Sequence, residues 1–91
     1  MKSDGVIALV TGGASGLGEA VVRDIVRRGG KAAILDISDE AGTRLEKELG
    51  GSAVYCRADV ASEADVTRAI EQAVAKFGTV NVAVNSAGIS S

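Results

Sequence analysis

Short apolar runs alternate with segments of helical periodicity along the whole chain. Each apolar run lacks the polar alternation of a half-exposed strand, which is the pattern of a strand buried on both faces of a parallel sheet. Between the runs, apolar residues recur three or four positions apart while charged residues fall on the other side, as in an amphipathic helix. The pattern predicts strands at residues 6–10, 32–35, 53–58 and 80–84, and helices at residues 17–28, 39–49 and 63–77.

Glycines and hydroxyl side chains mark the expected helix ends. Pairs of glycines follow the first and second helices, and Gly78 follows the third, where a left-handed residue ends many helices. Ser38 and Ser62 are well placed as N-caps, and Asp65, three residues after Ser62, resembles the partner in a capping box. Strands that alternate with helices at this spacing predict an α/β fold with a parallel sheet and right-handed crossovers.

Composition bounds the classes of function. The 91 residues are expected to form one domain, and a net charge of −2 with interleaved signs argues against nucleic acid or an anionic membrane as a partner. No apolar run reaches the roughly 18–20 residues of a membrane span, and the first residues do not resemble a signal peptide. The single cysteine, Cys56, fits a cytoplasmic, reducing compartment, and the absence of histidine disfavours a zinc site and His-based catalysis.

A glycine-rich segment, TGGASGLG at residues 11–18, lies between the first strand and the first helix. Glycines at this junction permit a tight turn, a close approach of backbone N–H groups to phosphate oxygens, and close packing of helix on strand. The amino end of the helix adds a partial positive charge that favours an anion. The segment predicts a dinucleotide pyrophosphate site that includes Gly12, Ser15, Gly16, Leu17 and Gly18, although these glycines are also compatible with a turn that binds nothing.

Acidic residues end the second and third predicted strands. Asp36 lies eighteen residues after the glycine-rich segment, where a carboxylate accepts hydrogen bonds from ribose hydroxyls and repels a 2′-phosphate. Neither Ile37 nor Ser15 offers a cation to such a phosphate, so the pattern favours NAD over NADP. Asp59, followed by Val60, is placed to accept a hydrogen bond from an adenine amino group. The alternative for Asp36 is a solvated loop residue, and Asp59 is nearly as well explained as a turn residue that leads into a helix.

A fourth motif follows the last predicted strand, where Asn85, Ala87 and Gly88 are expected to contact the cofactor. A turn that merely needs an Asn and a Gly is the alternative. Together, the four motifs resemble those of the short-chain dehydrogenase/reductase family, and residues 77–89 look most like its 3-hydroxyacyl-CoA and hydroxysteroid dehydrogenase branch. The likeness covers essentially the whole chain and departs from the family where Ser86 replaces a second Asn. The motifs that carry it are TGGASGLG, Asp36, Asp59-Val60 and Asn85-Ser86-Ala87-Gly88.

The resemblance implies a Rossmann-type doubly wound sheet of about four strands in the order 3-2-1-4 with three helices, and NAD as cofactor. It further implies oxidation of a secondary alcohol, in this branch a 3-hydroxyacyl-CoA, to a ketone. The family's catalytic Ser, Tyr and Lys are expected beyond the end of this chain, since Tyr55 is followed four residues later by Asp59 rather than by Lys. No catalytic residue is therefore assigned, and residues 1–91 are interpreted as the N-terminal, NAD-binding portion of a longer enzyme that binds the substrate.

Two other interpretations stay open: a stand-alone nucleotide-binding module without catalysis, and an oligomerising scaffold whose cofactor motif is idle. Residues 1–91 by themselves are expected to self-associate or to be only marginally stable. The strand at residues 80–84 is apolar and would form an edge of the sheet, and such an edge invites pairing with another chain.

Overall fold

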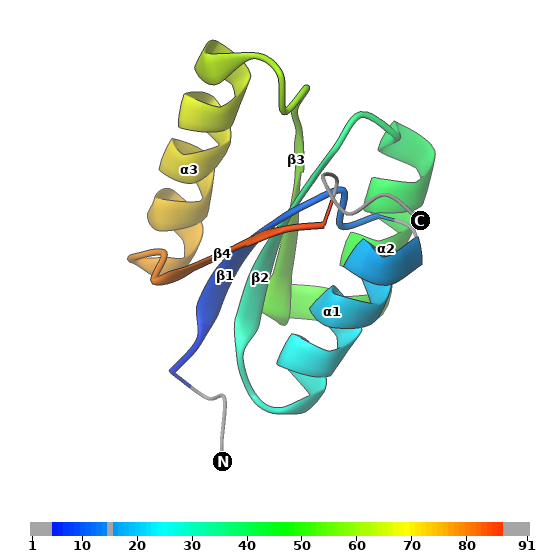
Figure 1. Cartoon of the computed structure of the whole chain (residues 1–91). Coiled ribbons are helices and arrows are strands. Elements are labelled where there is room, and N and C mark those ends of the chain that lie inside the picture. Colours follow the sequence, from blue (N-terminus) through cyan, green and yellow to red (C-terminus); the bar gives the residue numbers. More distant parts are fainter. Residues whose placement is uncertain (1–4, 15, 87–91) are drawn as a thin grey trace.

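The computed structural model describes residues 5–14 and 16–86, which form one parallel sheet with helices on both faces (Figure 1). The elements are β1 Ile7–Thr11, α1 Gly16–Arg27, β2 Lys31–Asp36, α2 Asp39–Leu49, the 3₁₀ turn η1 Gly50–Ser52, β3 Ala53–Arg57, α3 Glu63–Phe77 and β4 Val82–Asn85. Neighbouring strands are parallel, and their order across the sheet is β3-β2-β1-β4. The α/β class, the strand order and the three helices are confirmed, whereas η1 was not predicted.

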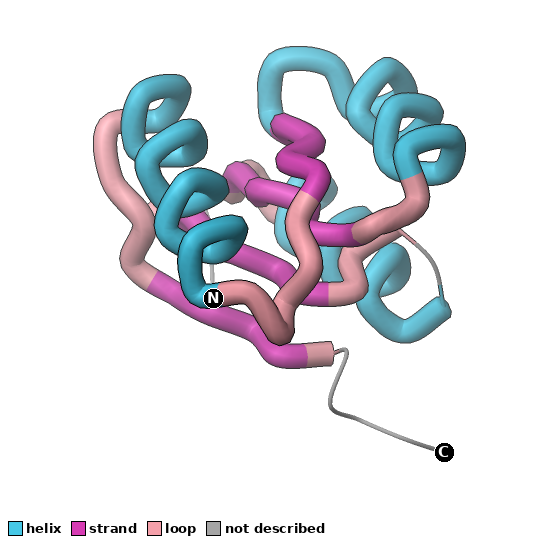
Figure 2. Tube along the Cα trace, turned by 90° about the horizontal axis from the view of Figure 1, so that it is seen from above, coloured by secondary structure: helices cyan, strands magenta, loops and turns pink. Residues whose placement is uncertain are grey.

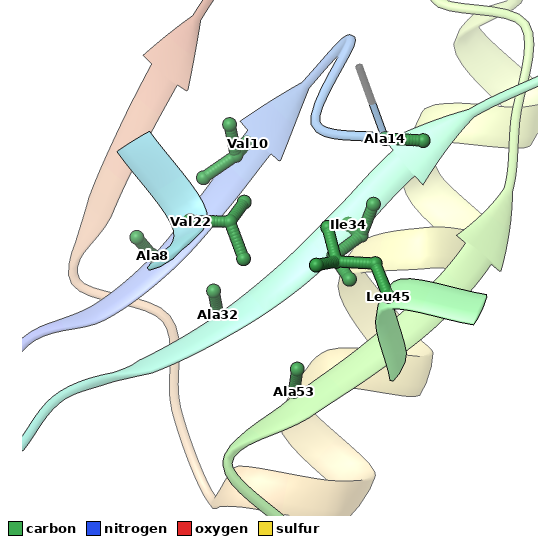
Figure 3. Packing of buried hydrophobic residues seen from close by; sticks show 8 residues of the cluster. All are labelled: Ala8, Val10, Ala14, Val22, Ala32, Ile34, Leu45 and Ala53. Carbon is green, nitrogen blue, oxygen red and sulfur yellow. The ribbon is translucent and has the colours of Figure 1, made fainter. Parts of the chain in front are cut away.

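Helices α1 and α2 cover one face of the sheet, and α3 covers the other (Figure 1). Because successive residues of a strand point to opposite faces, β1 contributes Ala8 and Val10 to the first face and Leu9 to the second. The side chains on both faces of each inner strand are therefore buried, which explains the unbroken apolar runs. The core of the first face, drawn in Figure 3, consists of Ala8, Val10, Ala14, Val22, Ala32, Ile34, Leu45 and Ala53.

The second face is covered less completely than the first. Two alanines of α3, Ala69 and Ala73, are buried in its core, but Ile70 and Val74 on the same helix are 39% and 40% exposed. Figure 2 shows β4, the strand that leads into the grey trace at the C-terminus, along the rim of the molecule. An apolar surface therefore remains open on this side of the described chain.

Cys56 lies in the core of the second face and is 2% exposed. Burial raises the pKa of its thiol to about 11, and the negative charge of Glu46 acts in the same direction. The thiol is therefore protonated at neutral pH, and its sulfur lies 3.9 Å from the carbonyl oxygen of Ala69 as a weak donor. Cys56 is a packing residue rather than a nucleophile.

The last strand begins two residues later than the apolar pattern predicts. Asn81, which precedes it, donates its backbone N–H to Ile7 O at 2.9 Å, but its side chain replaces the next backbone partners. Ile7 N–H donates to Asn81 Oδ1 at 2.9 Å, and Asn81 Nδ2 donates to Gly5 O at 2.7 Å. Val80 packs against the core of the second face before the strand starts. The predicted range of 80–84 therefore becomes Val82–Asn85, because a side chain takes over the pairing at residue 81.

The two predicted N-caps behave differently. Ser62 Oγ accepts a hydrogen bond from Asp65 N–H at 3.3 Å, as expected for a cap. The Asp65 carboxylate accepts from Asp59 N–H at 3.0 Å instead of closing a capping box, since Ser62 N–H already donates to Asp59 O. Ser38 occupies the N-cap position of α2 but its side chain makes no cap hydrogen bond. Its N–H donates instead to the carboxylate of Asp36.

Gly42, in the middle of α2, makes room for an aromatic ring. A Cβ built on Gly42 would lie 2.7 Å from Cγ of Tyr55 and closer still to the ring carbons on its near edge. Tyr55 projects from β3 toward α2, so its ring fills the notch left by the missing side chain. The helix therefore carries a residue of poor helical propensity because a residue of another element occupies the space.

We expect Gly42→Ala to destabilise the protein by about 1–2 kcal/mol, since overpacking a filled site outweighs the gain in helical propensity. Exchange of an exposed helical glycine for alanine normally stabilises by about 0.5–1 kcal/mol, so the sign is diagnostic. Thermal unfolding followed by circular dichroism measures the effect. Gly51→Ala is the matched control, because a Cβ there meets no atom within 4 Å. A melting temperature of Gly42→Ala at or above that of the parent chain would contradict this packing.

Candidate functional site

The carboxyl ends of β1, β2 and β3 surround a pocket of about 190 Å³. Parallel neighbouring strands end at the same edge of a sheet, and doubly wound folds bind ligands at that edge. The pocket is lined by Gly12, Leu35, Asp36, Ile37, Ala58, Asp59 and Val60. The structure thus brings together five of the residues predicted as cofactor contacts, from three separate segments of the chain.

Each predicted glycine of the turn has its own structural reason. Gly12 has a φ of 67° and its N–H donates to Leu35 O at 2.7 Å, which ties the turn to β2. Gly16 has a φ of 58°, and a Cβ built on it meets open space. At Gly18 a Cβ would lie 2.6 Å from the carbonyl carbon of Gly12 and nearer still to its oxygen. The helix therefore starts against the turn, and the backbone at Gly16 faces solvent where a ligand has access.

Gly13 is a site residue that the sequence analysis passed over. A Cβ there would lie 3.0 Å from Val10 O, 3.2 Å from Ile34 Cγ2 and 3.3 Å from Val22 Cγ2. The turn therefore lies directly on the core of the first face. The two adjacent glycines were the available signal, but the neighbours of Gly13 come from β2 and α1, which only the folded chain brings together.

Asp36 is the electrostatic centre of the pocket. Its Oδ1 accepts from the backbone N–H groups of Ile37 at 2.8 Å and Ser38 at 3.2 Å, and its Oδ2 accepts from Ala14 N–H at 3.1 Å. The carboxylate thus bridges the end of β2 and the glycine-rich turn. A carboxylate has about four acceptor positions, so acceptor capacity remains for a hydroxyl group in the pocket.

Asp59, Val60 and Ile37 line the remainder of the pocket. Asp59 Oδ1 accepts from Ala61 N–H at 2.9 Å, which fixes the carboxylate in a local turn and also fits the alternative of a turn residue. Ile37 is 64% exposed and Val60 is 44% exposed. In this part of the pocket, two exposed aliphatic side chains and the Asp59 carboxylate suit a flat, partly apolar group with a polar edge.

Asn85 lies at a second hollow beside the first. This hollow, of about 420 Å³, is lined by Leu9, Thr11, Val60, Val66, Ile70, Ala83, Val84 and Asn85. Thr11 Oγ1 donates to Asn85 Oδ1 at 2.9 Å, and Ser86 Oγ donates to Thr11 O, so the ends of β1 and β4 are joined. The two hollows share Val60, on the boundary between them.

Of the other predicted contacts that the structure describes, Gly16, Leu17 and Gly18 line neither hollow. Leu17 is 54% exposed at the start of α1. Ser15, Ala87 and Gly88 lie outside the described residues. Their expected contacts stay predictions.

Tyr55 lies outside the pocket lining, and its hydroxyl faces the other side of Asp36. Its oxygen lies 3.0 Å from the backbone oxygen of Asp36 and 2.8 Å from Oδ1 of Asp39. Burial, together with Asp39 and Asp36, raises the pKa of Tyr55 well above its ordinary value. The phenol is therefore a protonated donor at neutral pH, and it is engaged with these two oxygens.

Other features of the described residues offer no competing site. A hollow of about 490 Å³ lies on the outer surface of α2, but all its lining residues belong to that one helix. No group of three or more potential metal ligands occurs in the ranges 5–14 and 16–86. In the same ranges, no helix has the length and apolar character needed to cross a bilayer.

Comparison with known proteins identifies the family. The family model described as short chain dehydrogenase matches residues 6–91. The chain belongs to the short chain dehydrogenase family. The match includes every motif that carried the resemblance, and so the predicted family is confirmed.

Relatives and solved structures in the short chain dehydrogenase family agree with this assignment. The chain is 45% identical over 92 residues to zerumbone synthase of Zingiber zerumbet, covering 99% of this chain and 34% of that protein. It is 48% identical over 86 residues to human 3-hydroxyacyl-CoA dehydrogenase type-2, covering 94% and 33% respectively. Its fold is similar to the 3-ketoacyl-(acyl-carrier-protein) reductase of Brucella melitensis complexed with NADH, with a TM-score of 0.87, 36% identity, and coverage of 90% of this chain and 34% of that one. The chain thus spans about a third of the length of these relatives.

Proposed function

We propose that this chain is the NAD-binding portion of a short chain dehydrogenase. The observation that carries the proposal is the joining of the glycine-rich turn to the end of β2 at one pocket, where Ala14 N–H donates to the Asp36 carboxylate and Gly12 N–H donates to Leu35 O. The family membership and the similar fold of a reductase complexed with NADH support a nicotinamide dinucleotide as the ligand.

Each part of the site has a role in this proposal. The open backbone at Gly16 and the amino end of α1 bind the pyrophosphate through N–H groups and the helix dipole. Asp36 accepts hydrogen bonds from the adenosine ribose, while Ile37 and Val60 pack on the adenine ring and Asp59 accepts from its amino group. The nicotinamide supplies hydride transfer when it is bound. Asn85, at the second hollow, lies on the side where the nicotinamide half would extend.

Selectivity for NAD over NADP follows from the charges around the ribose position. A 2′-phosphate would meet the carboxylate of Asp36, and Ile37 offers no compensating cation. Two arginines, Arg57 and Arg68, line a neighbouring hollow, but they pair with Asp39 at 3.4 Å and Asp65 at 3.6 Å. Their charges are balanced by carboxylates, so they give a phosphate little attraction.

For the whole protein, we infer oxidation of a secondary alcohol to a ketone, with a 3-hydroxyacyl-CoA as one candidate substrate. The similarity to proteins named 3-hydroxyacyl-CoA dehydrogenase type-2 supports this substrate class. The acid–base groups would come from segments that follow residue 91, since Tyr55 is engaged with Asp36 and Asp39. A stand-alone binding module is the alternative, favoured by the same engagement of Tyr55. The balanced surface charge and the buried, protonated thiol suit a cytoplasmic protein without a nucleic-acid partner.

The Asp36→Ala variant tests the cofactor. We expect calorimetric titration of the parent chain to show binding of NAD and little binding of NADP. Asp36→Ala should weaken the affinity for NAD about 10- to 100-fold, as expected for loss of hydrogen bonds to a charged group. It should also reduce the difference in affinity between NAD and NADP. Equal or tighter binding of NADP by the parent chain would overturn the assignment to NAD.

The phosphate site is tested by a pair of glycine variants that are matched for backbone strain. Gly16 and Gly78 both have positive φ values, of 58° and 92°, and a Cβ meets open space at each. Alanine at either position should cost about 1–2 kcal/mol of stability. Only Gly16→Ala should also abolish detectable binding of ADP-ribose in the same titration, because Gly78 caps the far end of α3. Retention of parent-like affinity in Gly16→Ala would place the phosphate site elsewhere.

Self-association is part of the proposal, with a second copy of this chain as the partner. Among the described strands, β4 pairs only with β1 and is therefore an edge strand of the described sheet. Exposed apolar side chains flank this edge on both faces of the sheet: Val82 on the face that α1 and α2 cover, and Ile70 and Val74 on α3. Burial of such a surface contributes about 25 cal/mol per Å².

We expect the parent chain to sediment as a dimer or larger species at high micromolar concentration. Val82→Lys, which places a charge on the edge strand, should shift the population toward monomer. Thr43→Lys, an equal change of charge at an exposed position on α2, is the control and should leave the distribution as it was. A well-folded parent chain that stays monomeric throughout this range would contradict the interface.

A further inference from the structure

The backbone carbonyl of Asp36 is held by hydrogen bonds from β3 and from the residue that follows it. The carbonyl oxygen accepts from Ala58 N–H at 3.0 Å and lies 3.0 Å from the phenolic oxygen of Tyr55. The Asp36 carboxylate accepts from Ala14, Ile37 and Ser38. The residue that faces the pocket is therefore bonded at both its backbone and its side chain.

Two contacts with α2 fix the position of Tyr55. Its ring lies in the notch at Gly42, and its N–H donates to Glu46 Oε2 at 2.6 Å, which binds this point of β3 to α2. The phenol has one proton and two acceptors within reach, the Asp36 carbonyl and the Asp39 carboxylate. The two acceptors lie at the two ends of the loop between β2 and α2, so the phenol holds this loop from outside the pocket lining.

We propose that Tyr55 is a positioning residue for the pocket, whose hydroxyl holds the end of β2 so that the Asp36 carboxylate stays directed at the glycine-rich turn and the ribose. Tyr55 itself does not touch the dinucleotide, because it is absent from the pocket lining. The ribose part of this inference rests on the proposed function, whereas the link between Tyr55 and the carboxylate of Asp36 does not.

Binding of two nucleotides tests the ribose part. Tyr55→Phe keeps the ring in the Gly42 notch and removes only the hydroxyl. We expect it to weaken ADP about 3- to 10-fold, the range for one lost hydrogen bond, and to change the affinity for 2′,3′-dideoxy-ADP less than about 2-fold. In the Asp36→Ala background, Tyr55→Phe should have no further effect on ADP, since coupled residues are not additive. Equal weakening of both nucleotides would mean a merely structural role and would overturn the proposal.

Two further variants separate positioning from general destabilisation. Val54→Ala removes buried apolar volume from the adjacent residue of β3 on the opposite sheet face, and it should leave the ratio of the two affinities unchanged. Asp39→Ala removes one acceptor of the phenol and leaves the Asp36 carbonyl as the other, so it should change the ratio less than about 2-fold. A large change in Asp39→Ala would instead assign the effect to Asp39 and overturn the role given to Asp36.

Amide hydrogen exchange tests the positioning without any nucleotide. Three amides, those of Ala14, Ile37 and Ser38, donate to the Asp36 carboxylate. Tyr55→Phe should accelerate their exchange beyond the change in global stability, whereas Val54→Ala should accelerate it only in proportion to that change. Unaltered exchange of these amides in Tyr55→Phe overturns the inference whether or not ADP binds. Faster exchange in a chain that binds neither nucleotide would support the positioning and refute the proposed function.

Discussion

The backbone of α1 approaches the end of β1 so closely at Gly18 that no side chain fits between them. This contact sets the position of the helix relative to the sheet, and most of the site depends on it. Gly13 lies on the core formed by β1, β2 and α1, and Gly12 is bonded to β2. The turn is therefore fixed by packing on one side and by hydrogen bonds on the other, which leaves the backbone at Gly16 as its open part.

A second constraint joins the ends of the strands. The Asp36 carboxylate links β2 to the turn after β1, and the phenol of Tyr55 links β3 to the same residue. Thr11 and Ser86 do the same for β1 and β4. Four strands that are far apart in sequence thus end in one bonded network. This network lies at the edge of the sheet where doubly wound folds bind ligands.

Much of this architecture was predictable from local sequence pattern. The strand runs and the helix periodicities follow from burial on two faces, whereas the order of the strands was implied by the family resemblance, and all three were confirmed. The start of β4 was misplaced because Asn81 pairs with Ile7, a contact between residues 74 positions apart. The roles of Gly13 and Gly42 were missed for the same reason, since their neighbours come from other elements. Glycine spacing and strand-end aspartates predicted five of the residues that line the pocket, because those signals are local, whereas the contacts of Tyr55 come from other elements.

The three N–H groups that bind the Asp36 carboxylate have a consequence for recognition. They restrict the side-chain rotamers before any ligand arrives, so the loss of conformational entropy, about 0.5–1.5 kcal/mol for a mobile side chain, accompanies folding rather than association. A preorganised acceptor discriminates between ligands mainly through how long each one stays bound, since orientation-limited encounter rates vary little among related ligands. The difference between one ribose and another should therefore be carried by residence time rather than by speed of capture.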